Sequence, residues 1–305
     1  MKIYINRQPV VGPWGGGNKT LSALCEELSK DNTVVYDLEP NIDKIVCFDP
    51  RPNKKGVWYQ HFLNYKHVYP NTKIVQRVGD VGTHSKPELT NLVKQSVQHS
   101  NHIIFPSIWA KDYIKYDKQN YDVVENAAKE IFFENKRRFT GLDFNKEIKL
   151  VTHHWSDNPK KGFRVYEKIG NMIQSQPGIN MSLTYIGRYN KNFSNDGVNL
   201  IDPIDANELS KKLPQYDVYI TASLEEAGAN HVLEAMACGL PILYRVGGGS
   251  INEYCNDYGL EYTDEKIEDM MSLLKNLDNL KSDIKTYNRP IKTIIERYKE
   301  IICKI

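Results

Sequence analysis

The most informative stretch of this sequence contains two glutamates separated by seven residues. Residues 223–241 read SLEEAGANHVLEAMACGLP, with Glu226 in a run of small residues and Glu234 further along. A carboxylate accepts two hydrogen bonds at once, which suits a vicinal diol such as the 2′ and 3′ hydroxyls of ribose. A glutamate early in a helix is also favoured by the helix dipole alone, so the surrounding residues must decide its role.

A helix predicted from residue 230 positions the second glutamate. Asn230 is suited to cap this helix, because its amide side chain can accept from an unpaired backbone N–H. The backbone amides of Gly228, Ala229 and Asn230 then favour acceptor oxygens or negative charge at the helix start. We therefore expect these three residues, with Glu234, to bind sugar hydroxyls or phosphate.

Two further turns are candidates for binding phosphate. Gly247, Gly248 and Gly249 lie between a predicted strand and a predicted helix, and without a Cβ their amides can approach an anion closely. Lys161 falls at the predicted start of another helix, where a cation is disfavoured by about 0.3–1 kcal/mol unless an anion is bound there. A flexible turn and a solvated lysine are the structural alternatives.

The glycine-rich run GPWGGGNKT at residues 12–20 matches neither of two nucleotide-binding motifs. A P-loop needs lysine directly after its second glycine, but Asn18 separates Gly17 from Lys19. A dinucleotide-binding fingerprint needs a third glycine where Thr20 stands, although Asp37 lies at a suitable distance downstream.

Short apolar runs alternate with segments of helical period, which predicts an α/β fold with parallel sheets covered by helices on both faces. The predicted strands of the first half are 2–5, 33–36, 44–47, 73–77, 102–106 and 121–125, with helices near 20–30 and 87–100. Those of the second half are 148–152, 181–187, 218–222 and 241–244, with helices beginning near 161, 206, 230, 250 and 264. We expect two doubly wound Rossmann-like domains facing across a cleft.

The predicted domains span residues 1–145 and 146–289. The boundary falls at the end of a polar stretch, 134–146, which carries Lys136, Arg137 and Arg138. The last segment, 290–305, has one apolar helical face and is expected to pack back on the first domain. Ligands of open α/β sheets bind beyond the carboxyl ends of the strands, where the candidate residues fall.

Composition and charge exclude several classes of protein. With 40 basic and 38 acidic residues, the chain lacks the charge excess of a nonspecific nucleic-acid binder, so no nucleic-acid partner is expected. No apolar run is long enough for a transmembrane segment. Five scattered cysteines without a CxxC pair fit a reducing compartment, and we expect a cytoplasmic protein.

The run from Glu226 to Pro241 resembles the E-x7-E motif of retaining glycosyltransferases with the two-domain GT-B fold, family 4 type. After Glu234 the sequence continues AMACGLP, and then Gly247–Gly249 and Glu253 follow. The resemblance implies that Glu234 binds the ribose of a nucleotide and that Glu226 lies beside the donor sugar and the diphosphate. Gly228 and Ala229 stand where the family has Phe-Gly.

The resemblance extends to other candidate residues. Lys161 and Gly162 match the second half of the family's Arg-x4-Lys-Gly motif, which neutralises the donor diphosphate, while Ser156 stands in place of the arginine. Lys160, His154 and Arg245 are the residues that can supply the missing charge. Two further positions match by place in the fold: the glycine turn facing the diphosphate would be Gly15, Gly16 and Gly17, and the family's histidine would be His84.

The sequence thus predicts a retaining glycosyltransferase that moves a sugar from a UDP- or GDP-sugar to a hydroxyl of a glycan, lipid-linked or small-molecule acceptor. No cofactor and no metal are expected, since the chain has no Asp-x-Asp motif and no His/Cys cluster at metal-binding spacing. Two alternatives stay open: a nucleotide-sugar-binding or scaffold protein without transfer activity, and an NAD-dependent oxidoreductase built on residues 15–20 and Asp37.

Overall fold

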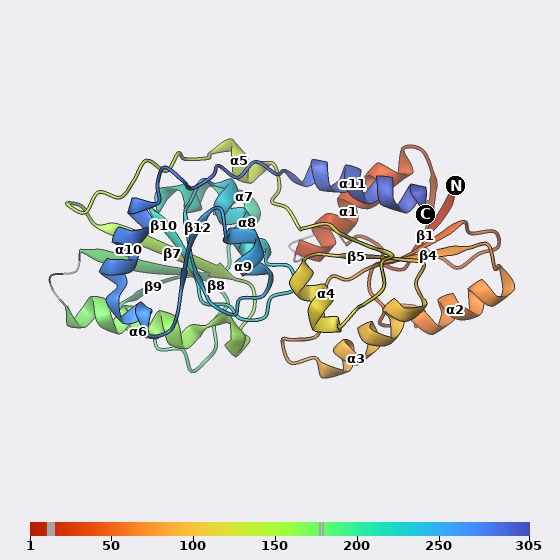
Figure 1. Ribbon diagram of the computed structural model, residues 1–305, viewed down its shortest axis with the longest axis horizontal. Coiled ribbons are helices and arrows are strands. Elements are labelled where there is room, and N and C mark those ends of the chain that lie inside the picture. Colours follow the sequence, from red (N-terminus) through yellow and green to blue (C-terminus); the bar gives the residue numbers. More distant parts are fainter. Residues whose placement is uncertain (11–15, 177, 179) are drawn as a thin grey trace. The chain divides into compact units, whose positions relative to one another are not determined.

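The computed structural model describes residues 1–10, 16–176, 178 and 180–305. They form two compact units, one made of Met1–Asn126 with Ile291–Ile305, the other of Ala127–Pro290. Each unit contains a six-stranded parallel sheet with helices on its faces, so the predicted α/β, doubly wound fold class is confirmed (Figure 1). Within these ranges, no helix is long and apolar enough to cross a membrane.

The sheet of the first unit has the strand order β2-β1-β3-β4-β5-β6. Its strands are β1 (Lys2–Ile5), β2 (Thr33–Val35), β3 (Lys44–Cys47), β4 (Lys73–Arg77), β5 (His102–Phe105) and β6 (Tyr121–Val123). All six were predicted; the central strands give short apolar runs because both of their faces are covered, as Ile45, Val46 and Cys47 of β3 illustrate.

Helices cover both faces of this sheet. They are α1 (Gly16–Ser29), α2 (Tyr59–Val68), α3 (Pro87–Ser96), α4 (Ile108–Ile114) and the last helix of the chain, α11 (Ile291–Lys304). Figure 1 shows α1 and α11 on one face and α2 and α3 on the other. The sequence did not predict α2, whose run YQHFLNYKHV buries only Tyr59 and Phe62 and therefore has a weak apolar period.

Helix α11 belongs to the first unit although it follows the whole second unit in sequence. Its apolar face, which includes Ile294, Ile295 and Ile302, is buried, and it packs along α1. The hydroxyl of Tyr298 accepts a hydrogen bond from Nε of the buried Arg77 at 3.1 Å, which ties the helix to the end of β4. Lys299 adds ion pairs to two acidic side chains of the α1 region.

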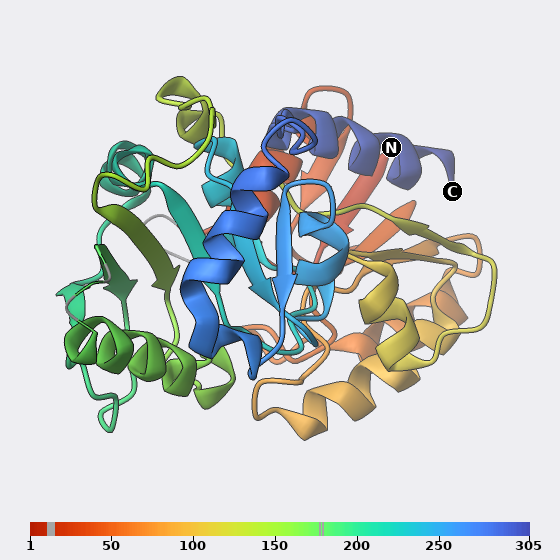
Figure 2. The same cartoon turned by 60° about the vertical axis from the view of Figure 1, so that its left-hand side comes forward.

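The second unit repeats the doubly wound pattern with the strand order β12-β11-β10-β7-β8-β9 (Figure 2). Its strands are β7 (Ile148–His154), β8 (Met181–Gly187), β9 (Val198–Ile201), β10 (Val218–Thr221), β11 (Ile242–Arg245) and β12 (Gly259–Tyr262). Its helices are α5 (Ile131–Glu134), α6 (Phe163–Ser175), α7 (Ala206–Lys212), α8 (Asn230–Ala237), α9 (Ser250–Cys255) and α10 (Met270–Asn279). The outer strands β9 and β12 were not predicted, because their partly exposed residues give no continuous apolar run.

Alternate side chains of the central strands pack in two separate hydrophobic cores of this unit. Tyr219 and Ile242 pack with α7, α8 and α9, whereas Ile220 and Leu243 pack with α6 and α10. Successive side chains of a strand point to opposite faces, so each core covers one face of the sheet.

The two units divide after Asn126, whereas the sequence analysis placed the boundary after residue 145. The physical reason is burial: Ala128 and Phe132 belong to the core of the second unit. The stretch from 134 to 146 is polar, but it is fixed on the second unit, where the amide of Arg137 donates to the carbonyl of Cys238 at 3.0 Å.

We predict that Tyr298→Phe lowers the free energy of unfolding of the first unit by about 1.5–3 kcal/mol, because it removes an acceptor from a buried guanidinium. Urea denaturation of the full chain measures the change, with Phe at the half-exposed Tyr189 as the matched control. Equal stabilities of the two variants would show that the hydrogen bond to Arg77 does not hold α11.

Candidate functional site

The candidate residues of the second unit gather at the carboxyl ends of β7, β10 and β11. Strands β7 and β10 are neighbours at the point where the connections change direction across the sheet, and ligands of doubly wound sheets bind at such a switch point. The loop after β7 contains Lys161, the loop after β10 contains Glu226, and the loop after β11 contains Gly247–Gly249. The site is therefore built from loops on a rigid sheet.

Backbone hydrogen bonds join the loop after β10 to the loop after β11. The amide of Glu225 donates to the carbonyl of Gly247 at 3.0 Å, and the amide of Glu226 donates to that of Gly248 at 3.1 Å. In return, the amide of Ser250 donates to the carbonyl of Glu226 at 2.8 Å. Positive φ angles at Gly247 (79°) and Gly249 (72°) let the second loop turn this way.

Lys161 and Glu226 form an ion pair at this edge of the sheet. Both side chains are largely buried, with exposed fractions of 12% and 13%. The lysine is the last residue of a short 3₁₀ turn, Pro159–Lys161. Asn158 caps this turn, because its side chain accepts from the amide of Lys160 at 3.0 Å. The predicted cation and the first predicted carboxylate are thus brought together, and an anionic ligand would compete with Glu226 for Lys161.

Gly162 allows the lysine turn to lie against the end of β10. Its φ is +86°, and a Cβ at this position would overlap the carbonyl of Ala222. The amide of Leu224 donates to the carbonyl of Lys160 at 2.9 Å, which fixes the same approach from the other side. This close contact requires the glycine of the Lys-Gly pair on steric grounds.

Glu234 is buried, and its Oε2 lies 3.0 Å from Nε2 of His153. His153 is fully buried in β7, and its Nδ1 lies 3.1 Å from the hydroxyl of Tyr219. Because an ionised carboxylate only accepts, His153 donates to it from Nε2. The sequence analysis did not select His153; a histidine inside a buried strand that leads to a candidate loop was the available signal.

A second histidine, His231, lies beside this pair in the first turn of α8. Burial lowers its pKa to about 3; nearby positive charge on Lys161 acts in the same direction, while Glu226 and Glu234 oppose it. Its Nε2 is 2.9 Å from the hydroxyl of Thr221, and its ring centroid is 4.9 Å from that of His154. His231 is therefore a neutral imidazole at neutral pH.

The start of α8 differs from the sequence prediction. Asn230 is the first residue of the helix, and Ala229 occupies the N-cap position without a side-chain cap, so the expected capping role of Asn230 is wrong. The amide of Ala229 donates to the hydroxyl of Ser250 at 3.0 Å. The sequence predicted that this amide faces an anion. In the structure it instead hydrogen-bonds within the unit, because the loops after β10 and β11 meet at this point.

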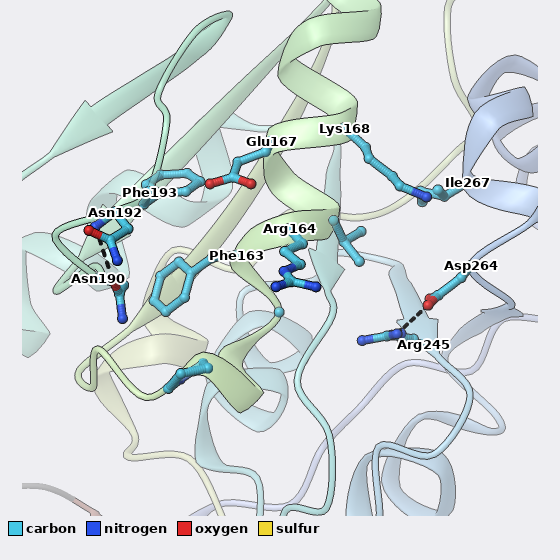
Figure 3. A pocket seen from close by; sticks show the side chains of 13 residues that line it. Phe163, Arg164, Glu167, Lys168, Asn190, Asn192, Phe193, Arg245, Asp264 and Ile267 are labelled. Carbon is cyan, nitrogen blue, oxygen red and sulfur yellow. Dashed lines mark hydrogen bonds and ion pairs between the residues drawn. The ribbon is translucent and has the colours of Figure 1, made fainter.

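Ser156, which stands in place of the family arginine, and Arg245, one of the residues expected to supply its charge, lie in different surroundings. The hydroxyl of Ser156 accepts from the amide of Asn158 at 3.2 Å, a local turn contact. Arg245 pairs with Asp264 and lines a cavity of about 680 Å³ together with Arg164 (Figure 3). Lys161, Glu226 and Glu234 are not among the lining residues of this cavity, so Arg245 is directed to a neighbouring space.

Residues 150–277 match the family model described as glycosyl transferases group 1. The matched segment contains the paired Lys161 and Glu226 and the buried Glu234. This segment of the chain is similar to the group 1 glycosyltransferases. No curated protein matches its sequence significantly.

Several solved structures resemble this chain along nearly its whole length. The apo form of WaaB, described as a lipopolysaccharide outer core galactosyltransferase, has a TM-score of 0.66 at 14% identity and covers 100% of this chain and 98% of its own. Sucrose-phosphate synthase from Thermosynechococcus elongatus has a TM-score of 0.62 at 13% identity, covering 99% and 96%. The pneumococcal O-GlcNAc transferase GtfA, in complex with UDP and GlcNAc, has a TM-score of 0.56 at 13% identity, covering 94% of this chain and 59% of its own. At these identities the likeness establishes the GT-B fold.

The remaining predicted residues belong to the first unit. Gly16 and Gly17 begin α1, and Gly15 lies outside the described residues. His84 is partly buried in the turn after β4. Arg77, the last residue of β4, donates to the hydroxyl of Tyr298 and so holds α11.

We predict that the buried His231 makes the second unit less stable as the pH falls. Its pKa of about 3 in the folded chain lies below the ordinary value of 6.5, so between these pH values the unfolded chain binds a proton that the folded chain does not. The contribution of neutral His231 to the free energy of unfolding is fully present above pH 6.5. Below that pH it falls by up to about 1.4 kcal/mol per pH unit. His231→Gln should flatten this slope in urea denaturation series, and Gln at the exposed His67 serves as control; parallel slopes for wild type and His231→Gln would contradict the prediction.

Proposed function

We propose that this protein is a glycosyltransferase that uses a UDP- or GDP-sugar as donor and transfers the sugar to an acceptor hydroxyl with retention of configuration. The observation that carries the proposal is the joint placement of Lys161, Glu226 and Glu234 at the switch point of one sheet. The spacing of the two glutamates and the family match of residues 150–277 support it. The crystallised complex of the structurally similar GtfA with UDP and GlcNAc supports a nucleotide donor.

In this proposal Glu234 binds the ribose of the donor. His153 occupies one oxygen of the carboxylate, Oε2, and thereby fixes the rotation of the side chain. A carboxylate with a fixed plane suits two adjacent hydroxyls, because both hydrogen bonds depend on its orientation. The hydroxyls of the diol are donors, so each can hydrogen-bond to an oxygen of an ionised carboxylate.

The diphosphate is assigned to Lys161 and to the glycine turn after β11. Negative charge grows on the diphosphate as the bond to the sugar breaks, so a preorganised cation stabilises the transition state more than the ground state. Release of Lys161 from Glu226 toward the phosphate would leave that carboxylate beside the donor sugar. If the acceptor attacks on the face that the leaving group departs from, a diphosphate oxygen takes the acceptor proton and no protein nucleophile is needed.

We also propose that transfer needs no metal ion, since Lys161 and backbone amides provide the positive potential. Addition of a chelator should leave the rate unchanged, and a loss of activity restored by Mg²⁺ or Mn²⁺ would refute metal independence.

A protein that binds the nucleotide sugar without transfer is the second candidate function, favoured by Ser156 in the place of the family arginine.

A thermal-shift panel of UDP, GDP, ADP and NAD separates these readings. We predict stabilisation by UDP or GDP and none by NAD; a ligand at a hundred times its Kd stabilises the bound state by about 2.7 kcal/mol. Glu234→Ala should abolish this stabilisation, whereas Ala at the exposed Glu208 of α7 should preserve it. Undiminished nucleotide binding by Glu234→Ala would remove the ribose assignment.

We predict that Lys161→Ala lowers kcat by a factor of about 10²–10³, equivalent to 2.7–4 kcal/mol of barrier, by analogy with removal of one oxyanion donor. Ala at the exposed Lys149 of β7 is the matched control. Initial rates of sugar transfer, or of donor hydrolysis when the acceptor is unknown, measure the effect. Unchanged turnover in Lys161→Ala would exclude the assigned role, and nucleotide binding without turnover in the wild type would favour the second candidate.

A further inference from the structure

The second unit contains a cavity of about 500 Å³ at the edge of the sheet opposite the candidate site. Its lining includes Leu240 and Pro241, which directly precede β11, whereas the glycine turn of the candidate site follows β11. We call it the basic cavity, defined by its basic lining residues Lys136, Arg137, Arg138, Lys281 and Lys285.

The five basic side chains come from two segments that are far apart in the sequence. No acidic residue is among the lining residues of the basic cavity. Like charges brought together in this way repel one another, and the repulsion grows where the dielectric constant is low. Placing these five basic side chains close together therefore requires negative charge nearby to compensate.

Acidic side chains behind the cavity wall compensate only part of this charge. Arg137 pairs with Asp217 at 3.2 Å, Lys285 with Asp257 at 2.6 Å, and Lys281 lies 3.8 Å from Asp278. Among the residues that the structure describes, no carboxylate pairs with the other two basic side chains of the cavity. Two positive charges are therefore left without an acidic partner.

Lys136, one of these two, is partly buried and donates to the carbonyl of Tyr287. Its ammonium lies 5.5 Å from the centre of the Phe133 ring. Burial lowers its pKa, and no carboxylate contributes in the opposite direction. Arg138, the other one, is exposed and lies next to it in the chain.

The segment that carries these residues is held in a fixed place. Gly239 has φ +82°, and a Cβ at this position would overlap the carbonyl oxygen of Arg137. The amide of Arg137 donates to the carbonyl of Cys238, and its guanidinium contacts the carbonyl of Tyr216. The basic cavity is thus a built feature of the unit.

We propose that the basic cavity binds a phosphate-bearing ligand at a second site, separate from the donor site. A guanidinium offers two parallel donors to a phosphate, and ammonium groups add compact positive charge. The wall also contains Phe139, Leu240 and Tyr258, which give an apolar surface to the rest of such a ligand. A free phosphorylated metabolite and the headgroup of an anionic lipid share this chemistry.

Titration calorimetry with inorganic pyrophosphate tests the site directly. Lys161→Ala is used as the background, so that the candidate donor site does not contribute. Binding should be at least tenfold weaker when Arg138→Gln and Lys281→Gln are added, and unchanged when the exposed Lys149 and Lys211 are replaced by glutamine instead. Absence of binding in the background protein, or equal binding by the two triple variants, overturns the proposal for a soluble ligand.

Co-sedimentation with vesicles distinguishes the two sources of phosphate. Vesicles of phosphatidylcholine with one quarter phosphatidylglycerol are compared with pure phosphatidylcholine vesicles. Sedimentation with the anionic vesicles alone, lost in Arg138→Gln/Lys281→Gln, assigns the site to lipid headgroups; pyrophosphate binding without sedimentation assigns it to a soluble ligand. If neither probe depends on these two residues, the proposal fails. Nucleotide stabilisation of the same variant should be unchanged, which separates this outcome from a failure of the proposed function.

Discussion

The backbone hydrogen bonds between the loops after β10 and β11 are the constraint on which the candidate site depends. They extend the pairing of two parallel strands beyond the sheet, as the bridge between Glu226 and Gly249 shows. A loop held in this way loses little further entropy when a ligand binds, since its backbone is already ordered. The lysine turn after β7 packs on the same loop through Gly162, so three loops share one scaffold.

Behind this scaffold lies a buried polar network that sets the charge state of the site. Tyr219, His153 and Glu234 form a chain of hydrogen bonds within the unit. Such a chain is stable only when each polar group finds its partner, because an unsatisfied buried group costs about 1–3 kcal/mol. His231 next to it stays neutral, so the negative charge of Glu234 and Glu226 is balanced chiefly by Lys161 at this edge.

Much of the fold and the core of the site could be predicted from the sequence. Strands covered on both faces give apolar runs in the sequence, and the glutamates and glycines directly follow such runs. Their common location at the carboxyl ends of the strands could therefore be predicted. The partner of Glu234 was not visible, because His153 is 81 residues away and meets it only through the order of the strands. The bond from Ala229 to Ser250 was missed for the same reason, and α2, β9 and β12 were missed because partial exposure weakens their apolar period.

The position of α11 also has a consequence for biosynthesis. A ribosome synthesises residues 1–126 long before residues 291–305, and the second unit is completed in the interval. During that time the surface of α1 that α11 covers is exposed to water, and Arg77 lacks the hydroxyl of Tyr298. The first unit is therefore completed after the second, and a chain that stopped before residue 291 would leave the first unit incomplete while sparing the second.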